Sequence, residues 1–84
     1  MTNTKTAETM TWQERQGRKM CEVRSTKQLI TDFINTGYMD NENVPTVRGW
    51  IMDELKKRNP EAYDAWLDDE TAEDRDLRKY YGVA

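Results

Sequence analysis

Residues 45–67 read PTVRGWIMDELKKRNPEAYDAWL, and this stretch predicts two consecutive helices. Pro45 suits the first turn of a helix, where its missing N–H costs nothing. Val47, Ile51 and Leu55 recur every four residues, so they fall on one face of a helix. The sequence therefore predicts an apolar helical face here as its best-supported feature.

The first of these helices, expected over residues 45–58, ends where the second begins. Lys56-Lys57-Arg58 close it, because cations are favourable at the negative C-terminal end of a helix. Asn59-Pro60-Glu61 then supplies a cap, a proline and an acid in the order that favours a helix N-terminus. The apolar face of the second helix is expected to comprise Tyr63, Trp66 and Leu67.

Two further helices are predicted upstream, each after a capping-box pattern. Thr11–Glu14 opens a helix over about 12–24, and Ser25–Gln28 opens a helix over 26–36 that stops at Gly37. An internal glycine weakens the first helix by about 1 kcal/mol relative to alanine. Its apolar stripe is thin and comprises Trp12, Met20 and Val23. The apolar face of the second comprises Leu29, Ile30, Phe33 and Ile34.

Downstream, Thr71 is expected to cap a last short helix that ends before Gly82 and carries Leu77, Tyr80 and Tyr81. No segment alternates in the manner of a strand. The sequence therefore predicts an all-α fold, a compact single-domain bundle of four to five short helices over residues 11–84. A polar, flexible arm is expected over residues 1–10. The expected core comprises Leu29, Ile30, Phe33, Ile34, Val47, Ile51, Leu55, Trp66 and Leu67.

Composition limits the classes of protein to which the chain can belong. Its 84 residues carry a net charge of −3, with no histidine and one cysteine. One cysteine excludes an internal disulfide and fits a reducing compartment. No apolar run exceeds three residues, which argues against a transmembrane helix. A pI near 4.9 argues against attraction of the whole chain to nucleic acid or anionic lipid. We therefore expect a cytoplasmic protein without membrane contact.

The chain shows no pattern of a catalytic, metal or cofactor site. The absence of histidine removes the commonest general base and metal ligand. Cys21 lies among cations that favour a thiolate, but without a histidine partner a structural role is the better interpretation. The segment 40–43 lacks the glycine and terminal glutamate of a calcium loop. The sequence therefore predicts a non-enzymatic protein with no cofactor and no metal.

Charge is segregated along the chain. Residues 1–28 carry six Lys/Arg and three Asp/Glu, whereas residues 61–84 carry three Lys/Arg and eight Asp/Glu. An acidic helical surface with aromatic anchors is typical of protein binding to a basic partner. The candidate partner-binding residues are Glu61, Tyr63, Asp64, Asp68, Asp69, Glu70, Glu73, Asp74, Asp76, Tyr80 and Tyr81. The competing interpretation is that the aromatics form the core and the acids only keep the domain soluble.

Two other interpretations stay open. The helices over 26–36 and 45–58 can be read as a helix-turn-helix, whose candidate nucleic-acid contacts are Arg48, Lys56, Lys57 and Arg58. Direct DNA contact is less favoured, because the connection of about eight residues exceeds the usual three or four. The basic N-terminal segment can also pair with the acidic C-terminal one, within one chain or between two. The free cysteine and thin core leave room for a homodimer.

Residues 47–55 and 59–68, VRGWIMDEL and NPEAYDAWLD, look like segments of small proteins of phages and mobile elements. The short, acidic, histidine-free helical profile is similar in type to that of phage-borne inhibitors, including anti-CRISPR proteins. The resemblance implies an inhibitor of a host machine that handles nucleic acid. Carboxylates on helices can imitate the spacing of phosphates, so we expect a DNA mimic that occludes a basic, nucleic-acid-binding host protein. The resemblance transfers no role to any individual residue.

Overall fold

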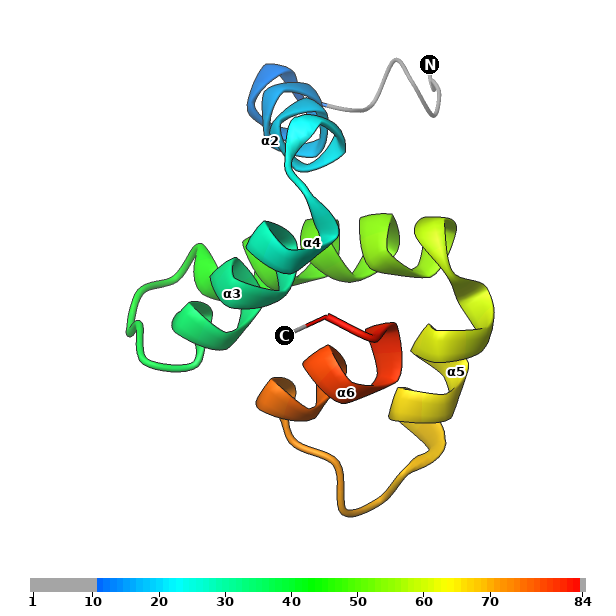
Figure 1. Ribbon diagram of the computed structural model, residues 1–84. Coiled ribbons are helices and arrows are strands. Elements are labelled where there is room, and N and C mark those ends of the chain that lie inside the picture. Colours follow the sequence, from blue (N-terminus) through cyan, green and yellow to red (C-terminus); the bar gives the residue numbers. More distant parts are fainter. Residues whose placement is uncertain (1–10, 84) are drawn as a thin grey trace, which may run out of the picture.

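The computed structural model describes residues 11–83, and every regular element in that range is a helix (Figure 1). This confirms the predicted all-α class; the expected arm over residues 1–10 lies outside the described residues. In chain order, the elements are α2 (Trp12–Val23), α3 (Thr26–Thr36), α4 (Val44–Arg58), α5 (Pro60–Asp68), the 3₁₀ turn η1 (Asp74–Asp76) and α6 (Leu77–Tyr81). None of the helices within 11–83 is both long and apolar enough to cross a membrane.

Helix α4 is the centre of the fold, because α2, α3 and α5 all pack on it. Helix α2 lies on one side of α3 and α4, and α5 and α6 lie on the other (Figure 1). Leu55 of α4 and Leu77 of α6 are fully buried, as is Phe33 of α3. The rest of the buried apolar cluster comprises Cys21, Leu29, Ile30, Ile51 and Tyr63.

The predicted helix starts are largely confirmed by their caps. Ser25 and Gln28 form a reciprocal capping box at the start of α3. The Asn59 side chain accepts a hydrogen bond from the Ala62 N–H and so caps α5. Thr11 accepts from the Glu14 N–H, but the Glu14 carboxylate binds Arg18 instead of closing the box. Each of these helix starts is thus marked by a hydrogen bond between residues three positions apart.

The predicted apolar stripe of α2 is wrong. Trp12, Met20 and Val23 are 65%, 59% and 74% exposed, and the helix instead turns Cys21 and Gly17 toward α4. The ring of Trp50 lies so close to Gly17 that a Cβ built there would overlap the ring carbons. The glycine that weakens the isolated helix therefore permits its close approach to α4.

Two details of the C-terminal prediction are also wrong. Leu67 is 56% exposed rather than buried, because α5 turns Ala62, Tyr63 and the half-buried Trp66 inward and leaves Leu67 outside that face. Leu77 of α6 is in the core instead. Thr71 does not cap the last helix, since its hydroxyl and N–H both bind Asp69 within a turn.

Candidate protein-binding surface

The outward face of α5 carries three carboxylates in a row. Glu61, Asp64 and Asp68 follow one another at i, i+3 and i+7, so a helix with 3.6 residues per turn places them on one side. All three are exposed, and none forms an ion pair within residues 11–83. We call Glu61, Asp64 and Asp68 the acidic stripe. The opposite face of α5 packs on the core, which fixes the orientation of the stripe.

The remaining predicted acids lie in the segment after α5, and most of them bind partners within the chain. Asp69 accepts hydrogen bonds from the Tyr80 hydroxyl and from Thr71, and these lower its pKa to about 2. Asp76 accepts from the Glu73 N–H at 2.8 Å, and the Glu73 carboxylate pairs with Arg75 at 2.9 Å. Asp74 is paired with Arg48. Among the acids after α5, Glu70 alone is exposed without such a contact in the described range. The structure therefore brings four, not eight, free carboxylates to this part of the surface.

The predicted aromatic anchors serve the fold. Tyr63 is only 8% exposed. The Tyr81 hydroxyl donates to the Leu55 carbonyl at 2.7 Å, and burial raises its pKa to about 12. The Tyr80 hydroxyl donates to Asp69. Tyr63 is therefore unavailable as a surface anchor, and the hydroxyls of Tyr80 and Tyr81 already have acceptors inside the molecule.

Arg48, the best candidate for reading a base, is held inside the fold. Its guanidinium makes two hydrogen bonds to Asp74, at 3.0 and 3.1 Å, and lies 3.9 Å above the centre of the Phe33 ring. It also donates to the Thr36 hydroxyl at 2.7 Å and to the Phe33 carbonyl. Arg48 thus joins α3, α4 and η1. Nothing in the local sequence around it predicts this role, because its partners lie 12, 15 and 26 residues away.

Arg58 is also used internally. Its guanidinium pairs with the buried Glu54 and donates to the Thr26 hydroxyl and the Cys21 carbonyl. It thereby binds the C-terminal end of α2, where a cation is favourable. Burial raises the pKa of Glu54, but hydrogen bonds from Arg58 and Lys57 outweigh this effect and lower the pKa overall. The exposed Lys56 and Lys57 are the remaining candidate cations of this helix.

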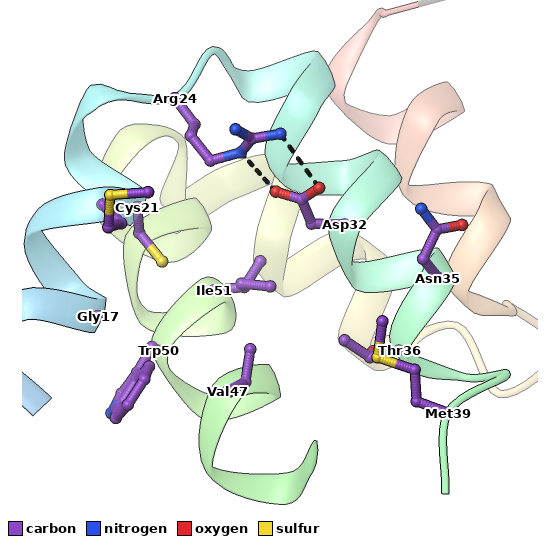
Figure 2. Close-up of a pocket in the computed structure, with 11 residues that line it drawn as sticks. Gly17, Cys21, Arg24, Asp32, Asn35, Thr36, Met39, Val47, Trp50 and Ile51 are labelled. Carbon is purple, nitrogen blue, oxygen red and sulfur yellow. Dashed lines mark hydrogen bonds and ion pairs between the residues drawn. The ribbon is translucent and has the colours of Figure 1, made fainter. Parts of the chain in front are cut away.

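A hollow that the sequence does not predict lies between α2, α3 and α4 (Figure 2). Its volume is about 460 Å³. Val47, Trp50 and Ile51 rise from α4 between the other two helices, and the Arg24–Asp32 ion pair stands at its edge. Cys21 also lines it, and burial raises the pKa of this thiol, which disfavours the reactive thiolate. The lining residues come from three helices and from the segments that follow α2 and α3, so no single stretch of sequence reveals the hollow.

Comparisons with protein-family models, curated proteins and solved structures found no match for this chain. Within residues 11–83, no three His, Cys, Asp or Glu side chains are grouped so that they could hold a metal ion. The candidate surface is therefore defined by geometry alone, and its clearest element is the acidic stripe.

Proposed function

We propose that this protein is a non-enzymatic binding module that docks to a basic protein partner through the acidic stripe of α5. The observation that supports this proposal is the alignment of Glu61, Asp64 and Asp68 on one exposed helical face, free of ion pairs within the described residues. The neighbouring Glu70 extends the same charge. Because the inner face of α5 is packed on the core, the helix backbone that carries these carboxylates is fixed before a partner arrives.

The partner class follows from the charge pattern. Carboxylates on one face attract a cationic surface and raise its association rate. A helix rises about 1.5 Å per residue, so the carboxylates of the stripe stand about 4.5 and 6 Å apart along the axis. Successive phosphates of one DNA strand advance about 3.4 Å. The stripe is thus a sparse imitation of a phosphate backbone, suited to a groove that binds nucleic acid.

The role that best fits such a module is stoichiometric occlusion. A protein that occupies a basic groove excludes nucleic acid from it and needs no catalytic group. The resemblance in type to phage-borne inhibitors, including anti-CRISPR proteins, agrees with this role. We therefore propose an inhibitor of a nucleic-acid-handling host protein. No observation favours the DNA-reading alternative, because Arg48 and Arg58 are engaged inside the fold.

The test is affinity capture from a host lysate treated with nuclease, followed by mass spectrometry. The wild type should retain a basic, nucleic-acid-binding protein in stoichiometric amount. The D64K/D68K variant, which reverses two charges of the acidic stripe, should lose it. The matched control is D40K/E42K, which changes the net charge equally at two exposed loop residues. This control should bind as the wild type does.

Two results would overturn the proposal. Equal capture by D64K/D68K and by the wild type would remove the acidic stripe from binding. Recovery that disappears with nuclease, together with duplex DNA binding at about 50 mM salt, would favour the DNA-reading alternative. In that case Lys56 and Lys57 would be the first residues to change.

A further inference from the structure

Helix α2 leaves three large apolar side chains mostly exposed in the described structure, among polar and charged residues of its outer side. Three of the six large apolar side chains that are exposed in residues 11–83 lie on this one helix: Trp12, Met20 and Val23. The helix is held to the fold from its inner side, by Gly17 against Trp50 and by the Arg18–Asp53 ion pair at 2.9 Å. An exposed apolar helix face on a small soluble domain marks an interaction surface.

Four exposed residues lie in one line along this face. Trp12, Gln16, Lys19 and Val23 follow at intervals of four, three and four residues, with apolar side chains at the two ends of the line and polar ones in the middle. On one flank of this line of four residues lie Arg15 and Glu22, seven residues apart. On the other flank lie Gln13 and Met20. We call these eight residues the α2 outer face.

Some charged side chains of α2 form ion pairs within the fold, and others, on the flank of the α2 outer face, do not. Glu14 and Arg18 pair with each other, and Arg18 also pairs with Asp53. Arg15 and Glu22, on the flank of the α2 outer face, are exposed and form no ion pair in the described part of the chain. This flank therefore carries a cation, Arg15, and an anion, Glu22, seven residues apart and on the same side of the helix, and neither is paired within the described residues.

We propose that the α2 outer face binds the same face of a second copy of this chain, with the two helices antiparallel about a twofold axis. In that arrangement Trp12 lies opposite Val23 of the second copy, and Gln16 lies opposite its Lys19. Arg15 then faces Glu22 of the second copy, and symmetry repeats every contact. The one interface buries the exposed apolar residues and pairs the free charges.

The charge pattern selects this partner and this direction. In a parallel pair, Arg15 would face Met20 of the other helix and its charge would stay unmatched. In the antiparallel pair, Arg15 of each copy faces Glu22 of the other. A twofold contact requires this complementarity, because the same surface is used on both sides. The central Gln16–Lys19 pair is polar; such a pair fixes register and lowers affinity. A three-turn interface of this kind makes a weak dimer.

This inference goes beyond the proposed function and does not depend on it. The acidic stripe is on α5, which lies on the opposite side of α4 from α2 (Figure 1). A dimer through α2 therefore leaves both acidic stripes free and displays two of them. Two linked sites bind a multivalent partner more tightly than one site does.

The test is sedimentation equilibrium on the full chain up to about 1 mM, because interfaces of this size are weak. The wild type should form dimers. R15E and E22R should each raise the dissociation constant at least about tenfold, since each places like charges opposite each other. The double variant R15E/E22R should dimerise as the wild type does. K27E, which changes charge on an exposed residue outside the interface, is the matched control and should not alter dimerisation.

A mixing experiment tests the antiparallel direction itself. R15E chains carry two anions on the flank and E22R chains carry two cations, so an equal mixture should form heterodimers that neither variant forms alone. Circular dichroism should show every variant folded, because both residues are exposed. A wild type that stays monomeric throughout, or single variants that dimerise unchanged, would overturn the proposal. So would a mixture that stays monomeric.

Discussion

At the scale of single residues, glycine has opposite effects at two positions of this fold. Gly17 and Gly49 both lie in helices, where alanine is favoured by about 1 kcal/mol. A Cβ at Gly17 would overlap the ring of Trp50, whereas a Cβ at Gly49 would meet nothing within 4 Å. Helix propensity and packing therefore act against each other at Gly17 only.

We expect G17A to lower the free energy of unfolding by about 1–3 kcal/mol, because the clash with Trp50 outweighs the gain in propensity. The matched variant G49A should raise it by up to about 1 kcal/mol. Urea denaturation followed by circular dichroism measures both. If G17A were as stabilising as G49A, the close approach of α2 to Trp50 would be disproved.

At the scale of elements, one ion pair joins η1 to α4. Arg48 of α4 makes two hydrogen bonds to Asp74 of η1 while its guanidinium lies over the Phe33 ring of α3. Both side chains of the pair are more than two-thirds buried. The planar guanidinium suits both contacts, and a lysine cannot reproduce them.

We expect R48A to lower the free energy of unfolding by about 1.5–3 kcal/mol, in the range of hydrogen bonds to charged groups. R48K should recover only part of this loss. A double-mutant cycle with D74A should return a coupling free energy of about 1 kcal/mol or more. Additive effects of the two substitutions would show that Arg48 and Asp74 do not act together.

The caps show which elements can be predicted from local sequence. Ser25 with Gln28, and Asn59, form their hydrogen bonds within three residues, so a short window of sequence contains both partners. Thr71 shows the limit of this reasoning. It has the residue type of a cap, but its hydroxyl donates to the nearby Asp69 carboxylate instead of capping the helix. The final helix starts instead after η1, where Glu73 and Asp76 form a box.

At the scale of the whole molecule, buried and bridging carboxylates make stability depend on pH. The pKa of Asp69 is lowered to about 2 by its hydrogen bonds, and the pKa of Glu54 is also lowered. A lowered pKa means that the unfolded chain binds more protons than the folded one as the pH falls. These carboxylates therefore stabilise the fold at neutral pH, and this contribution disappears in acid.

We expect the free energy of unfolding to fall as the pH is lowered, with the Asp69 contribution lost between its ordinary pKa of 3.8 and about 2. D69N should flatten the profile in that window, whereas D40N, at an exposed loop residue, should keep the wild-type shape. Urea denaturation at a series of pH values measures the profile. Identical profiles for D69N and the wild type would contradict the role of Asp69.

The acidic character of the candidate site could be predicted from the sequence, but the particular carboxylates that form it could not. The concentration of acids after residue 60 is visible in the sequence, and Glu61, Asp64 and Asp68 are exposed as an acidic surface requires. Asp69 and Asp74 carry the same charge but bind Tyr80 and Arg48. Their partners are brought near by folding, so composition could not separate free carboxylates from engaged ones.

The sequence by itself determined the helical class, most helix ends and the acidic character of the C-terminal third, because these depend on residues within a few positions of one another. Only the tertiary structure decided which faces turn inward. Leu67, expected in the core, is exposed, and Leu77, which was not among the expected core residues, is fully buried. Trp12 lies outside, whereas Gly17 lies against Trp50. Periodicity predicts a face, but which face is buried depends on the shape of the helix packed against it.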